Sequence, residues 1–313
     1  MALGLRDSTA ALIQQAGFGA DEPLVVGVRQ RGEPPVFLTR GLSADTVLYT
    51  ASLSKQVTAA CAALLVQRAR LDTSSTLAQW MPELPAWAHG ITVRHLIHHT
   101  SGLPEGVDFD DLDRAGLDRT TAGVIEALTR HDRLDGTPGT AFRYCNAGYV
   151  CLAVVVERAA GRPLPAFADD NVFRPLGMSA TRYWAGPAPH PPGAAPTPAQ
   201  CPAALSLGDG GMWSTAPDLI RWNDALERDE LGVSELLQTP GRLDDGTPLD
   251  YAWGLGVREH AGRRIHRHGG RWAGVCTQLV RVAGEGSSFV VIALDDDEDR
   301  TERLATSLLT AGE

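Results

Sequence analysis

Strand-forming sequence at both ends of the chain is the feature that most constrains the fold. Residues 23–41, "PLVVGVRQRGEPPVFLTRG", read as two strands joined by a polar Arg-Gly-Glu turn. Three segments near the other end, 251–270, 275–284 and 287–297, supply further strands. Because each strand has an apolar face to bury, the two ends are expected to contribute to one sheet.

Between these ends the sequence is mostly helical. Apolar residues recur with the helical period in five central segments, 52–70, 92–99, 121–131, 147–160 and 217–227. Each chain end adds a helix, at 5–16 and 299–313. The predicted fold class is α/β (α+β), an antiparallel sheet built from both chain ends and flanked by helices, with an inserted mostly helical region.

We expect a single domain over residues 1–313. Its α/β part covers 1–60 and 205–313, and its mostly helical part covers 61–204. The proline-rich run 185–202 is predicted to be a surface loop. It is not interpreted as a domain linker, because strand sequence that the sheet needs still follows it.

Charge and cysteine content exclude several classes of protein. A net charge of −10 argues against a nucleic-acid partner and against an anionic membrane surface. The first residues lack a basic region followed by an apolar one, and nothing approaches the length of a membrane span, so we expect a cytoplasmic protein. Five cysteines without CxxC spacing suggest neither a disulfide framework nor a zinc site.

Lys55 is the only lysine, and every other one of the 28 basic residues is arginine. Arginine stays protonated at any accessible pH, whereas a buried lysine amine can release its proton and accept one from a neighbour. Lys55 is therefore expected to have a chemical role. The alternative is chance, a lysine whose ammonium group is simply solvated.

Ser52 precedes Lys55 by three residues, so the two share one face of a helix that is predicted to begin near Ser52. That helix is apolar almost all round, which predicts that it is buried. Ser52 is thus a candidate nucleophile with Lys55 as proton acceptor, while Ser54 points elsewhere. The pattern alone is weak, because serine is a common residue at helix N-termini.

A second pattern, "RYCNAGY", places Tyr144 and Asn146 two residues apart before the helix 147–160. Residues two apart in an extended segment point the same way, so a phenol and an amide would face one cavity. Tyr144 is a candidate general base, and Asn146 a candidate ligand of a substrate carbonyl. The alternative is a packed tyrosine followed by Asn146 as a helix N-cap.

A third pattern, "RIHRHGGRWAG", ends a predicted strand with His268, Gly269 and Gly270. The glycines allow a ligand or another backbone to approach closely. His268 is expected to shuttle a proton or to hydrogen-bond the substrate, and the amide of Arg271 to join that of Ser52 in an oxyanion hole. The alternative is a β-bulge with an exposed histidine.

Together, Ser52-x-x-Lys55, Tyr144-x-Asn146 and His268-x-Gly270 resemble the three motifs of the serine hydrolases that include class C β-lactamases, DD-peptidases, D-aminopeptidases and family VIII esterases. The intervening sequence is also similar to that family. The similar segments are "HLIHHTSGLP", "PGTAFRYCNAGYVCLAVVVERAAGRPL", "FRPLGM" and "GDGGMWSTAPDLIRW". The resemblance covers residues 47–295 and implies a β-lactamase/transpeptidase-like fold.

The resemblance also implies a mechanism. Ser52 would attack an acyl carbon, Lys55 and Tyr144 would relay its proton, and Asn146 would orient the substrate. His268 and Gly270 would lie in the substrate-binding site, and the amides of Ser52 and Arg271 would bind the oxyanion. Neither a metal nor another cofactor is expected. The three histidines His95, His98 and His99 belong to the "HTSGL" segment and lack carboxylate partners at ligand spacing.

The third motif departs from that of class C β-lactamases, which carry Lys-Thr-Gly there. His268-Gly269-Gly270 lacks the threonine hydroxyl, which disfavours β-lactam or DD-peptide substrates, and it resembles the triplet of D-aminopeptidases and some esterases. An export signal is not expected from the first residues, and this expectation points the same way. Nearby arginines could still bind an anionic group, and they are Arg264, Arg267 and Arg271.

The expected function is hydrolysis of a small-molecule ester, amide or lactam through an acyl-enzyme on Ser52. An acyltransferase with the same acyl-enzyme is the first alternative, and a non-catalytic binding protein on this scaffold is the second. The acidic run 108–119 either favours cationic substrates or, in our preferred interpretation, is a solvated face. Substrate identity and oligomeric state cannot be predicted from this sequence.

Overall fold

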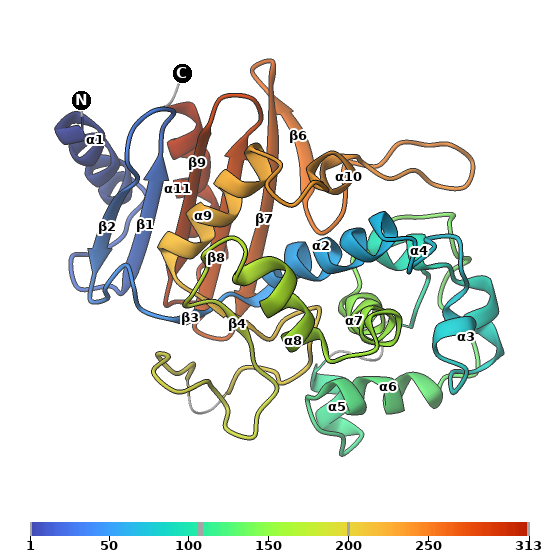
Figure 1. Cartoon of the computed structure of the whole chain (residues 1–313). Helices are drawn as coiled ribbons and strands as arrows, with labels where there is room; N and C mark the ends of the chain where they lie inside the picture. The colour runs from blue at the N-terminus through green and yellow to red at the C-terminus, as the bar shows by residue number, and fades with distance from the viewer. Residues whose placement is uncertain (1, 105–108, 199–200, 312–313) are drawn as a thin grey trace.

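The strands from the two ends of the chain form one sheet, as predicted (Figure 1). The computed structural model describes residues 2–104, 109–198 and 201–311. Every pairing in the sheet is antiparallel, and the strand order is β2-β1-β9-β8-β7-β6. These strands are β1 (Leu24–Arg29), β2 (Val36–Arg40), β6 (Gly256–His260), β7 (Arg263–Trp272), β8 (Val275–Val282) and β9 (Ser287–Ala293).

Alternate residues of the central strands bury two different faces of this sheet. Val26 and Val291 pack in an apolar cluster with residues of the terminal helices α1 (Ala2–Gln15) and α11 (Glu298–Thr310). Val25 and Val290 belong to the larger core, to which α9 (Ala216–Glu227) contributes on the other face. Helices thus cover both faces, in agreement with the predicted fold class (Figure 1).

The central part of the chain is helical and surrounds α2 (Ser54–Gln67), which packs against α7 (Asn146–Ala160). All α2 residues from Ser54 to Leu65 are buried, as its apolar circumference predicts. The other elements here are α3 (Leu77–Trp80), α4 (Val93–Ile97), α5 (Phe109–Arg114), α6 (Thr121–Thr129), α8 (Leu164–Ala168), α10 (Ser234–Gln238) and the single turns η2 (Ala86–Gly90) and η3 (Asp169–Phe173). Several of these helices were not predicted, because one or two turns are too short to show a period.

One boundary matters for function. The predicted helix 52–70 does not begin at Ser52, because a 3₁₀ turn, η1 (Ala51–Leu53), comes first and α2 starts at Ser54. The turn follows β3 (Leu48–Tyr49), which pairs with β5 (Met212–Ser214), itself paired with β4 (Arg182–Tyr183). Ser52 therefore lies at the junction of this small sheet and the central helix.

The described residues of the proline-rich run, 185–198 and 201–202, form neither helix nor strand, as predicted. Across the described ranges, none of the helices combines the length and the hydropathy that a membrane span requires. The division of the chain into an α/β part and a helical part within one domain stays a prediction.

Buried histidines make the fold sensitive to acid. Burial lowers the pKa of His98 to about 4 and that of His266 to about 3. His266 is 4% exposed, and neither of its ring nitrogens has a partner among the described residues. An unfolded chain protonates both histidines below about pH 6.5. Because the unfolded state then binds more protons, the free energy of unfolding decreases as pH falls from about 6.5 toward these lower values.

Replacing His266 with phenylalanine should make the fold less sensitive to acid. One proton fewer then separates the folded and unfolded states, so the slope of unfolding free energy against pH below pH 6 should decrease by up to about 1.4 kcal/mol per pH unit. Urea denaturation of wild type and His266→Phe at several pH values measures this slope. The exposed His89, replaced by glutamine, is the control, and an unchanged slope in His266→Phe would contradict a neutral buried His266.

Candidate active site

Ser52 lies in a strained turn. The preceding residue, Ala51, has a φ of +48°, a left-handed conformation that costs a residue with a side chain about 1 kcal/mol. The Ser54 hydroxyl donates to the carbonyl of Ala51 at 2.7 Å, and the Leu53 amide donates to Thr50 at 3.2 Å. These bonds hold the turn, and strain of this kind is frequent at functional sites.

Lys55 connects the first two motifs. Its Nζ donates to Ser52 Oγ at 3.0 Å, to Asn146 Oδ1 at 2.8 Å and to the main-chain carbonyl of Asp209 at 2.8 Å. The side chain is 0% exposed. Three acceptors match the three N–H bonds of an ammonium group, so the geometry fixes Nζ beside the serine hydroxyl.

His99 holds the segment that carries Tyr144. The His99 carbonyl accepts from the amide of Arg143 at 2.8 Å, and its Nδ1 accepts from the amide of Cys145 at 3.0 Å. Its ring lies 4.4 Å from the Tyr144 ring, measured between centroids. Burial, followed by the nearby Lys55 charge, lowers the pKa of His99 well below its usual value. A neutral His99 can accept from Cys145, so the backbone is fixed on both sides of Tyr144.

Tyr144 itself is 42% exposed, and Lys55 Nζ lies 4.9 Å from the centroid of its ring. Asn146 opens α7 but is not its N-cap, since that position is Cys145. The alternative that Asn146 caps the helix is therefore wrong, and its Oδ1 instead binds Lys55. Tyr144 and Asn146 thus both lie beside the Lys55 ammonium.

The glycines of the third motif lie beside the Ser52 turn. A Cβ atom at Gly270 would be 2.7 Å from the Thr50 carbonyl oxygen and 3.1 Å from the Ser52 nitrogen. Only glycine therefore permits this approach of β7 to η1. The ladder from Ile265 to Trp272 is unbroken, so the alternative of a β-bulge is wrong.

Beyond Arg267, the edge of β7 that faces away from β8 has no paired strand among the described residues. Its pairing with β6 ends at Arg267, opposite Gly256. The amide of Ala283, the residue after β8, donates to the carbonyl of Arg264 at 2.9 Å, so even-numbered β7 residues bond toward β8. By alternation, the main-chain groups of Gly269 and Arg271 point to the opposite, free edge. The Arg271 amide is thus directed away from β8, as an oxyanion donor requires.

His268 is held in a neutral state by its surroundings. Its Nε2 accepts from the Tyr251 hydroxyl at 3.1 Å, and its Nδ1 donates to the carbonyl of Gly269. Burial first, and then the Lys55 charge, lower the pKa of His268 to about 3. The histidine is 8% exposed, so the alternative of an exposed side chain is wrong. A buried neutral ring with both nitrogens bonded fits a positioning role better than a proton shuttle.

The three arginines expected near an anionic group are each paired with a glutamate. Arg264 Nε lies 3.2 Å from Glu259, and Arg267 Nη2 lies 2.7 Å from Glu302. Arg271 Nη1 lies 3.9 Å from Glu298 of α11. Since β7 alternates, the side chains of Arg267 and Arg271 lie on the face of the sheet opposite His268.

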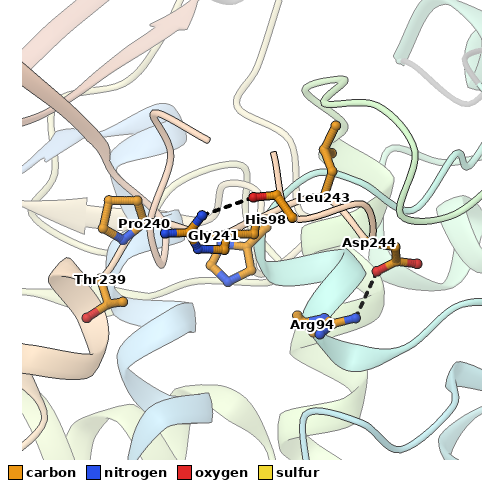
Figure 2. A pocket seen from close by; sticks show the side chains of 9 residues that line it. Arg94, His98, Thr239, Pro240, Gly241, Leu243 and Asp244 are labelled. Carbon is orange, nitrogen blue, oxygen red and sulfur yellow. Dashed lines mark hydrogen bonds and ion pairs between the residues drawn. The ribbon is translucent and has the colours of Figure 1, made fainter. Parts of the chain in front are cut away.

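The histidines of the "HTSGL" segment have separate surroundings. His95 Nε2 lies 3.5 Å from Asp244, His98 contacts Trp253 edge-on at 6.2 Å, and His99 packs on Tyr144. His98 and Arg94 line a pocket of about 680 Å³. Figure 2 shows these side chains, with Arg94 paired to Asp244. Among the described residues, no group of three His, Cys, Asp or Glu side chains is arranged to hold a metal.

The acidic run is partly paired within itself. Its first residue, Asp108, lies outside the described residues, and α5 begins at Phe109. Asp111 pairs with Arg114, and Asp113 pairs with Arg119. This internal pairing favours the interpretation of a solvated face over a site for cationic substrates.

Sequence reasoning missed two residues of the site. The carbonyl of Asp209 binds Lys55, and its buried carboxyl, whose pKa burial raises, accepts from Ser206 Oγ at 3.0 Å. Tyr251 binds His268. No periodic pattern identifies a main-chain acceptor, and Tyr251 precedes β6 in irregular sequence, so neither had a local signal.

A family model described as beta-lactamase matches residues 12–311. The chain belongs to the beta-lactamase family. It is 28% identical over 293 residues to penicillin-binding protein 4* of Bacillus subtilis, covering 84% of this chain and 64% of that protein. It is 30% identical over 304 residues to a D-aminopeptidase of Cereibacter sphaeroides, covering 92% of this chain and 57% of the relative. The chain therefore spans less than two thirds of the length of these curated relatives.

Solved members of the fold agree with this placement in the beta-lactamase family. The D-amino acid amidase of Ochrobactrum anthropi, solved with L-phenylalanine amide, superposes with a TM-score of 0.79 over 99% of this chain and 100% of the amidase. The two sequences are 17% identical, so this likeness concerns the fold. The β-lactamase/transpeptidase-like fold implied by the three motifs is thereby confirmed.

Proposed function

We propose that this protein is a serine hydrolase that forms an acyl-enzyme on Ser52 and transfers the acyl group to water. The observation that carries the proposal is the hydrogen bond of 3.0 Å between Lys55 Nζ and Ser52 Oγ, made by a lysine side chain that is 0% exposed. A nucleophile with a fixed amine in contact is the arrangement that covalent acyl transfer needs. Membership of the beta-lactamase family supports the same reaction class.

Acylation begins when Ser52 Oγ attacks the substrate carbonyl carbon. Lys55, in its neutral form, takes the hydroxyl proton, because its Nζ is the group in contact with Oγ. Negative charge develops on the carbonyl oxygen, which the amides of Ser52 and Arg271 stabilise. Asn146, whose Oδ1 is bound to Lys55, has its amide nitrogen left to orient the substrate.

The leaving atom then receives a proton while its bond to the acyl carbon breaks. Tyr144 is placed for this transfer, since its ring lies 4.9 Å from Lys55 Nζ and its side chain is 42% exposed to the incoming substrate. In deacylation, water attacks the ester of Ser52, its proton returns through the same groups, and Ser52 Oγ is released with its proton. His268 is neutral and bonded to Tyr251, so its role here is to hold the Tyr251 side chain in place beside the substrate site.

The substrate is proposed to be a small ester or amide rather than a lactam. The relatives include a D-aminopeptidase, and the fold is shared with a D-amino acid amidase, which support amide or ester chemistry. The third motif has a neutral His268 and no threonine, so it lacks a cation and a hydroxyl with which to hold a substrate carboxylate.

Replacing Ser52 with alanine should abolish turnover and covalent labelling. A panel of p-nitrophenyl butyrate, D-phenylalanine amide and nitrocefin tests the substrate class, and mass spectrometry of the quenched enzyme locates the acyl group. We expect the ester to be hydrolysed and Ser52 to be acylated, with a loss of at least about a thousandfold in Ser52→Ala.

Ser54→Ala is the matched control. Ser54 is a buried hydroxyl two residues after Ser52, but it bonds the Ala51 carbonyl and not Lys55, so activity should remain within about tenfold of wild type. An acyl group on another residue, or an active Ser52→Ala enzyme, would refute the proposal. Coupled product in place of free acid, with an alcohol or amine present, would instead indicate an acyltransferase.

A further inference from the structure

Two exposed aromatic side chains flank the proposed reaction centre. Among the large apolar side chains of the described residues, Phe142 at 45% and Tyr144 at 42% are the exposed ones. They lie two residues apart, and both rings contact that of His99, at 5.8 and 4.4 Å between centroids, so they lie on the same side of the segment. A single exposed apolar residue is ordinary, but two adjacent ones beside a candidate nucleophile indicate a surface that a ligand covers.

The exposed rings pack on a larger aromatic cluster, whose other members, His99 and Tyr251, are 1% and 7% exposed. The Phe142 ring lies 5.6 Å from that of Tyr251 and 5.8 Å from that of His99. His99 in turn lies 4.4 Å from Tyr144, which contacts Lys55. We call Phe142, His99, Tyr144 and Tyr251 the aromatic wall. It extends without interruption from the Lys55 ammonium to the exposed Phe142.

The cations around this wall are already paired. Arg143, between the two exposed aromatics, donates to the carbonyl of Leu103 at 2.8 Å. Arg258, which follows β6 residue Val257, pairs with Asp250. A negatively charged group on the wall would therefore have no free partner among these side chains. An uncharged ring or alkyl chain needs no charged partner, so it can bind there without this cost.

The proposed mechanism indicates which part of a substrate contacts the aromatic wall. The proton that Tyr144 delivers goes to the leaving atom as the bond from that atom to the acyl carbon breaks. The leaving atom must then lie within about 3 Å of the Tyr144 oxygen. Whatever is attached to the leaving atom extends past Tyr144, along the side on which Phe142 and Tyr251 lie.

We propose that the aromatic wall binds the leaving group, and that the enzyme prefers esters or amides whose alcohol or amine part is aromatic or apolar and uncharged. This inference rests on the proposed acyl-enzyme on Ser52. It adds the substrate class and the role of Phe142, which no motif of the sequence indicates. In this proposal the acyl part of the substrate extends from the acyl carbon away from the leaving atom and so away from Tyr144, and Phe142 does not select it.

The test uses two pairs of substrates. Methyl and benzyl butyrate share an acyl group and differ in the leaving group, and acid release measures kcat/KM for each. p-Nitrophenyl acetate and p-nitrophenyl phenylacetate share a leaving group and differ in the acyl part. In Phe142→Ala, the benzyl-to-methyl ratio of kcat/KM should fall about tenfold, the scale expected for losing contact with one ring.

The phenylacetate-to-acetate ratio should change less than about twofold in the same variant, because the acyl part does not meet Phe142. Phe142→Leu, which keeps an apolar side chain, should retain most of the benzyl preference. The butyrate ester of 4-(hydroxymethyl)benzoate adds a negative charge to the benzyl group. Wild type should hydrolyse it at least about tenfold more slowly than benzyl butyrate.

Other outcomes distinguish failure of the proposed function from failure of the leaving-group inference. If every ester fails to react and Ser52 is not acylated, the proposed function is refuted. If Ser52 is acylated but Phe142→Ala leaves the benzyl-to-methyl ratio unchanged, only the leaving-group inference is refuted. A change in the phenylacetate-to-acetate ratio alone would place the acyl group on the wall, and a preference for the anionic ester would also overturn the inference.

Discussion

Lys55→Arg is expected to lower kcat/KM for p-nitrophenyl butyrate by at least about a thousandfold. A guanidinium group stays protonated and cannot accept the Ser52 proton. It is also larger, and Lys55 is 0% exposed with its Nζ enclosed by acceptors from Ser52, Asn146 and Asp209. Steady-state hydrolysis of the ester measures the loss.

A second variant separates proton transfer from side-chain size. Lys55→Met keeps a similar length and removes the amine, so it should be as inactive as Lys55→Arg. Circular dichroism and thermal denaturation of both variants check that the loss is not a failure to fold. An active Lys55→Arg enzyme would contradict the role of Lys55, the only lysine in the chain, as acceptor of the Ser52 proton. An active Lys55→Met enzyme would show that no amine is needed at all.

Gly270→Ala is expected to lower kcat/KM by at least about a hundredfold and to reduce thermal stability. The added Cβ would lie 2.7 Å from the Thr50 carbonyl oxygen and 3.1 Å from the Ser52 nitrogen. Both are backbone atoms at the nucleophile turn, so either β7 or η1 must shift. Such a shift separates the Ser52 and Arg271 amides, which should bind the oxyanion together.

Gly269→Ala is the matched control for this variant. Its Cβ would lie 2.8 Å from Nε2 of Gln278, the end of a flexible side chain that can move. We expect activity within about tenfold of wild type and a smaller change in thermal stability. If the two alanine variants behave alike, the close approach of β7 to the Ser52 turn is not what positions the nucleophile.

Local sequence was sufficient where the physical signal is local. The two strand-forming runs of residues 23–41 and the apolar circumference of the helix after Ser52 predicted a sheet strand pair and a buried helix, and both are present. The same reasoning misplaced the start of that helix. Ala51 has a left-handed backbone conformation. An alanine side chain does not predict a positive φ, because only the surrounding packing enforces that conformation.

Sequence motifs identified the residue types of the candidate site but not the protonation states of their side chains. Three spaced patterns singled out Ser52, Lys55 and Tyr144 because reaction chemistry restricts which side chains can serve. His268 was expected either to shuttle a proton or to hydrogen-bond the substrate. Its neutral state depends on burial, on the Lys55 charge and on the Tyr251 hydroxyl, all of which come from other parts of the chain.

The sequence by itself determined the fold class, the two chain ends that share a sheet, and the candidate residues of the three motifs. Tertiary structure alone decided how Lys55 is held, since its three acceptors come from positions 52, 146 and 209. The last of these is a main-chain carbonyl, which every residue has. Periodicity and composition reflect side chains and their neighbours along the chain, whereas a contact between a side chain and a distant backbone atom exists only after the chain has folded.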